Sequence, residues 1–193
     1  MEYILDRTFF RPREAIIYLN ECIKRALGSS RITVSVLTQT EVAYSQQRLK
    51  SLGVEWKREY PNLEIATKFF EHRKTQFRID EITSEEAKAF AVSVLEAPTQ
   101  LKDPIYDACE KYYLEDKLSL LEFMREIVAI FYHVGLCGVK PDAHLGRQWS
   151  YLDEPELEGG QIKSDAQIDL HKTFWAALGV VHSKGRFASE KEG

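Results

Sequence analysis

A full set of helix start and stop signals near the N-terminus is the feature that most constrains this fold. Pro12 suits the first position of a helix, where its missing N–H is not needed. Glu14 lies in the first turn, where the helix dipole favours an acid, and Gly28 is a typical helix end. Apolar residues recur between them at helical spacing: Ala15, Ile16, Leu19, Cys22, Ile23 and Ala26. The segment therefore predicts one amphipathic helix.

A second, longer helix should follow this one. Thr33 is a good N-cap, and the helix is expected to end at Gly53 or to continue to Trp56. We therefore predict a helical bundle over residues 1–60. Residues 61–82 are expected to connect this bundle to the rest of the chain, with one short helix over Leu63–Phe70.

The remainder of the chain reads as helices followed by strands. Helices should start near Thr83, at Asp103-Pro104, and at Leu118 or Ser119. Extended or alternating segments follow at Leu136–Val139, Gln148–Leu152 and Ala166–His171. Three helices and then a hairpin are the order of a winged helix. The predicted fold is therefore mainly α: a helical bundle, then a winged-helix domain with a small antiparallel β-hairpin over residues 83–181, and a polar tail over 182–193.

Charge and composition limit the possible functions. The net charge of -4 argues against a strong, uniform grip on nucleic acid, and the acidic segment Asp153–Glu158 would repel phosphates. A weak basic patch remains at Lys140, His144 and Arg147. The chain has no apolar run of membrane-spanning length and no secretory signal, and three widely spaced cysteines suit free thiols in the cytoplasm.

No motif predicts an enzyme. Gly135–Lys140 contains glycines and a lysine, but the spacing is not that of a P-loop, so the chain alone should not hydrolyse ATP. Cys137 could be combined with His133 or His171 and with Asp169 into a hydrolase-like set, but packed or capping histidines are the simpler interpretation. No cysteine or histidine spacing predicts a metal site.

Arg11 and Arg13 flank the start of the first helix and are the main candidate binding residues. A guanidinium group stays charged and binds phosphate oxygens as a fork, so either arginine could reach a phosphate. The alternative is that each arginine is simply solvated, or forms an ordinary surface ion pair with an acid such as Asp6 or Glu14, which is common and contributes little to stability.

The segment Asp6–Arg13, with Leu19-Asn20, Ile32-Thr33 and Tyr44-Ser45, resembles the lid that follows the core in a family of bacterial AAA- and STAND-like P-loop ATPases. His133–Val139 and His171–Phe174 are similar to the winged-helix pieces of the same family. The resemblance covers most of the chain, and some family members are associated with phage defence. It implies that Arg13, or else Arg11, contacts the phosphates of ATP held by an ATPase core.

Two functions are consistent with these features. In the first, the chain is a non-catalytic regulatory module of a P-loop ATPase, which senses ATP through its lid and binds a partner protein through its winged helix. In the second, it is a stand-alone DNA-binding winged-helix protein. The acidic balance favours the first.

Overall fold

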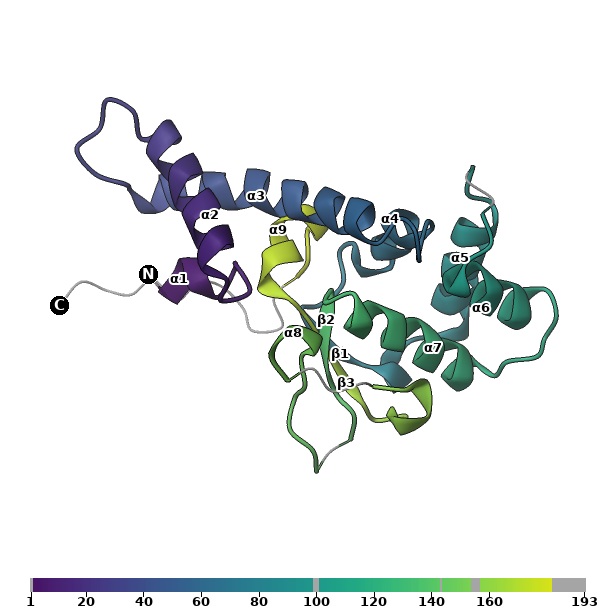
Figure 1. Ribbon diagram of the computed structural model, residues 1–193. Helices are drawn as coiled ribbons and strands as arrows, with labels where there is room; N and C mark the ends of the chain where they lie inside the picture. The colour runs from purple at the N-terminus through teal and green to yellow at the C-terminus, as the bar shows by residue number, and fades with distance from the viewer. Residues whose placement is uncertain (1, 99–100, 143, 154–156, 182–193) are drawn as a thin grey trace.

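The computed structural model describes residues 2–98, 101–142, 144–153 and 157–181, and they form a mainly helical fold with a small sheet (Figure 1). The fold class is therefore confirmed. The polar tail predicted over 182–193 and part of the acidic segment, residues 154–156, lie outside the described residues. The N-terminal helices are α1 Glu2–Leu5, α2 Pro12–Arg25, α3 Val34–Glu55 and α4 Leu63–Ala66. The helices that follow are α5 Ser84–Leu95, α6 Pro104–Tyr113, α7 Leu120–His133, α8 Ser150–Asp153 and α9 Trp175–Leu178. Short 3-10 turns are η1 Thr67–Phe70, η2 Ile79–Glu81, η3 Gly159–Gln161 and η4 Lys172–Phe174.

The predicted helix starts are confirmed by their caps, while α2 ends at Arg25, three residues before the predicted Gly28. The Thr33 side chain accepts a hydrogen bond from the Val36 N–H, and Thr83 and Ser119 each form a reciprocal capping box. Asp103 caps α6. Helix α3 continues past Gly53, so the longer of the two predicted helices is the observed one.

The sheet has three antiparallel strands, in the order β1 Gln76–Arg78, β3 Gln167–Leu170, β2 Cys137–Lys140. Phe77 and Val139 lie opposite Ile168 on either side of it. The strands expected within 136–139 and 166–171 are thus confirmed. Strand β1 comes from the segment expected only to connect two units. The strand was hard to recognise because it is only three residues long, and Phe77, its one apolar residue, lies among the basic residues Arg73, Lys74 and Arg78.

The strand predicted over Gln148–Leu152 is wrong. Only Gln148 bridges to β2, at Val139, and the chain then turns into α8. The indole of Trp149 lies so close to Gly138 that an added Cβ atom there would come within 2.6 Å of the ring. Five alternating residues can be read as a strand or as a short helix, and aromatic packing decides between them here.

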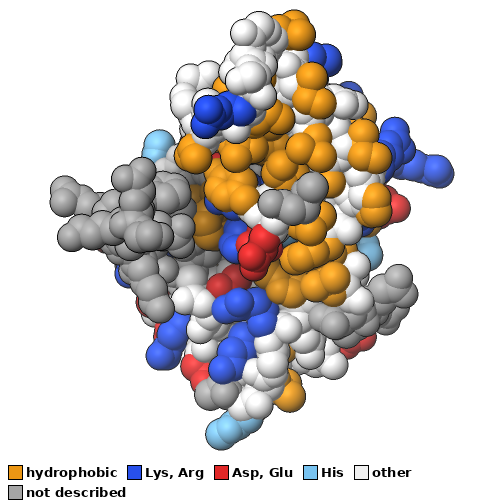
Figure 2. All heavy atoms as spheres, turned by 90° about the vertical axis from the view of Figure 1, so that its left-hand side faces the viewer, with side chains coloured by type: hydrophobic (Ala, Val, Ile, Leu, Met, Phe, Trp, Pro, Cys, Tyr) orange, Lys and Arg blue, Asp and Glu red, His pale blue; other side chains and the backbone are white. Residues whose placement is uncertain are grey.

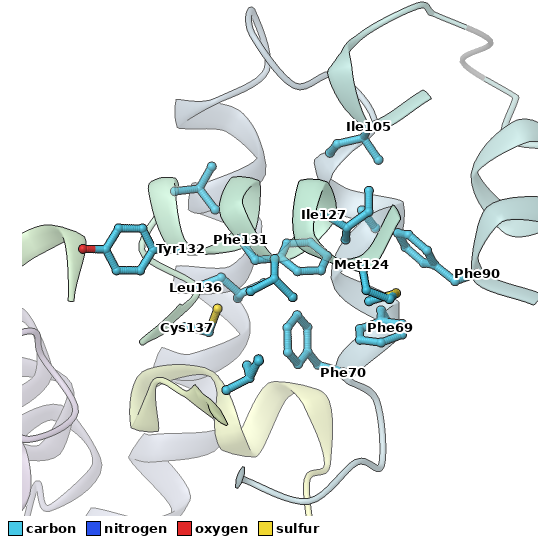
Figure 3. Close-up of a cluster of buried hydrophobic side chains, with 14 of the residues drawn as sticks. Phe69, Phe70, Phe90, Ile105, Met124, Ile127, Phe131, Tyr132, Leu136 and Cys137 are labelled. Atoms are coloured by element: carbon cyan, nitrogen blue, oxygen red, sulfur yellow. The ribbon is translucent and has the colours of Figure 1, made fainter. Parts of the chain in front are cut away.

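One large core holds most of the molecule together. Phe131 on α7 packs edge-on against Phe70, with ring centroids 4.9 Å apart, and Phe69, Met124 and Ile127 point into the same cluster (Figure 3). A second, smaller cluster of Ile4, Ala15, Tyr18, Cys22 and Tyr44 holds α1, α2 and the first half of α3 together. Figure 1 shows α3 as the long rod that connects this helical hairpin to the rest of the fold, with α9 packed against it.

We expect Phe131→Ala to lower the free energy of unfolding by about 3–5 kcal/mol, because it removes a fully buried ring and leaves a cavity. Leu114→Ala is the control: Leu114 is exposed, and its loss should change stability by less than about 0.5 kcal/mol. Urea unfolding of both variants measures the difference. Equal effects of the two changes would contradict this description of the core.

Candidate functional site

A strained loop positions the two arginines at the start of α2. Phe9 and Phe10 both have positive φ angles, 53° and 52°, which residues with side chains rarely adopt. Phe9 is buried and stacks on His171, with ring centroids 3.9 Å apart. The chain leaves this anchor at Arg11, whose backbone is extended, and α2 begins at Pro12 as predicted.

Arg11 and Arg13 are exposed and reach two different cavities. Arg11 lines a cleft of about 590 Å³ between α3, the end of α7 and α8. Arg13 lines a smaller cavity of about 240 Å³ between α2 and α3. Two residues, Arg48 and Glu55 of α3, line both cavities. The two arginines are therefore neighbours in sequence but do not share one site.

Within the described part of the chain, neither arginine forms an ion pair. Asp6 pairs instead with Lys172, with 2.5 Å between the carboxylate Oδ2 and Nζ. Glu14 accepts a hydrogen bond from the Tyr44 hydroxyl at 2.7 Å, and this contact together with burial raises the pKa of Tyr44. The predicted pairing with Asp6 or Glu14 is therefore not observed, and both guanidinium groups are exposed, as the solvated form of that alternative also requires.

Arg48 is the site residue that sequence reasoning missed. It is buried on α3, and its Nη1 donates to Glu55 Oε1 at 2.8 Å. Burial alone would lower its pKa, but the hydrogen bond and charge of Glu55 raise it overall. The sequence did contain a signal, because Arg48 follows Tyr44 by four residues and Thr40 by eight, on the buried face of a helix. A cation in such a stripe marks a position that needs a partner.

The hydrolase-like set is not assembled. His171 Nδ1 accepts from the Thr173 N–H, and Nε2 contacts the Tyr151 hydroxyl at 3.1 Å, so neither ring nitrogen contacts a thiol. Complete burial raises the pKa of the Cys137 thiol. Asp169 accepts hydrogen bonds from Gln76, Gln167 and Arg147.

His133, the other histidine considered for this set, lies at the surface. Its ring is edge-on to that of Trp56, with 4.9 Å between the two centroids.

The three basic residues before β3 are only partly available. Arg147 Nε pairs with Asp169 Oδ2 at 2.7 Å, while Lys140 ends β2 and His144 is exposed.

The segment Gly135–Lys140 is a helix end that leads into a strand. Gly135 has a φ of 78° and follows the last turn of α7. In the part of the chain that the structure describes, no cluster of histidine, cysteine and acidic side chains could hold a metal, and no helix is long and apolar enough to span a membrane.

Comparison with known proteins gives one similarity. Residues 1–53 match the family described as the FunZ-associated C-terminal helical domain. This range contains α1, α2 and most of α3. No curated protein and no solved structure matches the chain.

We expect stability to fall below about pH 6.5 because of His171. Burial, followed by the charges of Lys172, Arg48 and Arg11, lowers its pKa from 6.5 to about 3. An unfolded chain therefore takes up a proton that the folded chain excludes, so this stabilisation is complete above about pH 6.5 and declines as the pH falls toward 3, by up to about 1.4 kcal/mol per pH unit. Urea unfolding between about pH 7.5 and 5, above the carboxylate range, measures the slope.

His171→Gln is the matched control, because glutamine does not titrate. It should be less stable than the native chain at neutral pH, and its stability should change less between about pH 6.5 and 5. If both proteins lose stability equally over that range, His171 is not the group responsible.

Proposed function

We propose that this chain is a non-catalytic regulatory and interaction module of a P-loop ATPase, docked to its partner through the α2–α3 hairpin. One observation carries the proposal: the hairpin presents an exposed apolar face within the same residues that match the FunZ-associated C-terminal helical domain. The partner we propose is a P-loop ATPase core to which a FunZ-associated helical domain would be attached, called a FunZ-type ATPase core below; it is either an upstream domain or a separate chain. A role in phage defence belongs to the same proposal.

The apolar face consists of side chains on α2, in the loop that leads to α3 and at the first residue of α3. Its members are Ile16, Ile23, Leu27, Ile32 and Val34, of which Leu27 is 80% and Val34 is 75% exposed. Figure 2 shows hydrophobic side chains gathered on the upper part of this side of the molecule, where the hairpin lies in Figure 1. Contiguous exposed apolar side chains are typical of protein–protein contact surfaces.

The proposed nucleotide contact comes from Arg13. Its guanidinium group is exposed at the start of a fourteen-residue helix and has no ion pair among the described residues. A phosphate held by the ATPase core would meet a fork of donors there and would also benefit from the positive end of the helix dipole. ATP is thus proposed as a ligand of the assembly, with Arg13, and secondarily Arg11, as contacts from this chain.

The helices and strands after residue 83 support the alternative function, a DNA-binding winged helix. Helices α5 to α7 lead into β2 and β3, with β1 on the far edge, and this order favours a winged helix. Such a unit could bind a partner protein or DNA. We favour protein, because Arg147 is already paired with Asp169 and the chain is acidic overall. Sub-micromolar binding to short DNA duplexes with a steep salt dependence would favour the DNA-binding alternative.

We expect Ile23→Lys to weaken binding of the whole chain to a FunZ-type ATPase core by about tenfold or more, because a charge would be buried in an apolar contact. The fold should be unaffected, since Ile23 is exposed. Gln39→Lys is the control, because it adds the same charge at an exposed polar position of α3. Surface plasmon resonance with purified core and chain measures both. Equal affinity of Ile23→Lys and the native chain would argue against docking through this face.

We expect Arg13→Ala to leave the stability of the isolated chain within about 1 kcal/mol, as for any surface charge. In the complete assembly the same change should reduce the ATPase response by about tenfold or more, because one phosphate-directed donor is lost. Arg11→Ala should have the smaller effect there. An assembly whose nucleotide response is unchanged by Arg13→Ala would contradict the sensing role.

A further inference from the structure

The larger cleft contains a buried cation whose hydrogen-bonding capacity is not fully used. Arg48 is 9% exposed and is held to Glu55 through Nη1, but its Nε is buried without a hydrogen-bond partner. A buried donor that lacks an acceptor is costly, so such groups commonly mark positions that a ligand completes. Arg125 has a similar Nε, but it does not line the cleft.

A second cation lies beside the first. The guanidinium carbons of Arg11 and Arg48 are 5.6 Å and 5.7 Å from the centroid of the same ring, that of Phe9. His171 stacks on Phe9 and is uncharged at neutral pH, because burial and the nearby cations lower its pKa. Arg48 pairs with Glu55, whose side chain is half exposed, while Arg11 has no ion pair among the described residues. Glu14 also acts on Arg48, but it is engaged by Tyr44.

The other end of the cleft is aromatic. Trp56 is the C-cap residue of α3 and follows Arg48 by eight residues, which places it about 12 Å farther along the helix axis. Tyr60 and His133 lie near the Trp56 ring, with centroids 5.9 Å and 4.9 Å away. All three line the cleft, whose volume of about 590 Å³ is within the usual range for a small-molecule site. Glu158 also lines it, and its carboxylate accepts the backbone N–H of Gln161.

We propose that this cleft binds a small phosphorylated aromatic ligand of the nucleoside monophosphate class. The phosphate would lie between Arg11 and Arg48, where it supplies the acceptors that the two guanidinium groups lack. The aromatic ring would pack against Trp56 and Tyr60 at the opposite end. This site needs no partner protein and does not include Arg13, the main contact proposed for ATP in the assembly; Arg11, the secondary contact, belongs to both.

Titration of the whole isolated chain with AMP, adenosine and inorganic phosphate tests the proposal, by calorimetry and by tryptophan fluorescence. AMP should bind at least about tenfold more tightly than either fragment, because only AMP engages both ends of the cleft. Arg11→Ala and Arg48→Gln should each weaken AMP binding by about tenfold or more, as expected for loss of a charge-assisted contact. Trp56→Leu should weaken AMP but not inorganic phosphate.

Arg13→Ala is the matched control, because Arg13 is equally exposed at the same helix start but lines the other cavity. Its affinity for AMP should stay within about twofold of the native value. Thermal unfolding of each variant checks that it is folded. If Arg48→Gln does not fold, the AMP affinities of Arg11→Ala and Trp56→Leu test the proposal in its place. The proposal is overturned if AMP does not bind at millimolar concentration, if it binds no more tightly than inorganic phosphate, or if Arg13→Ala and Arg11→Ala weaken it equally.

Discussion

The stacking of Phe9 on His171 is the contact on which the arrangement of this molecule depends. It joins the N-terminal loop to the end of β3, and two polar contacts support it: the Thr173 hydroxyl donates to the Arg7 carbonyl at 2.6 Å, and Lys172 pairs with Asp6. Positive φ angles at Phe9 and Phe10 cost on the order of 1–3 kcal/mol each. Burial of the Phe9 ring and these contacts offset that cost. The loop is therefore held against the end of β3, and this fixes the direction in which α2 starts.

The helices could be predicted well from the sequence because the residues that start them act locally. Pro12, Thr33, Thr83 and Ser119 act through neighbours within four residues, so no knowledge of the fold is needed to recognise them. Strands are different. β1 is recognisable only once β3 is known to lie beside it. The alternation over Gln148–Leu152 did not become a strand, because Trp149 packs on Gly138 of the preceding strand β2, a contact that the alternation does not reveal.

The candidate site was likewise predictable from the sequence only in part. Arg11 and Arg13 could be singled out because they flank a recognisable helix start, and the structure confirms that position. Their separation into two cavities could not be predicted, because it depends on how α3 crosses α2. Arg48 was missed for a related reason: on a helix with many polar residues, a single arginine becomes informative only when its burial is known.

Arg48 and Glu55 connect the two cavities, since both residues line each of them. An anion beside Arg48 in the larger cleft would compete with Glu55 for the same guanidinium group. Release of Glu55 would in turn make the smaller cavity more acidic, next to Arg13. A ligand in one cavity would then change the free energy of binding in the other, and by linkage the effect would be equal in both directions. Because α3 also connects the docking hairpin to the core, this ion pair is the place where ligand binding, nucleotide contact and partner docking would influence one another.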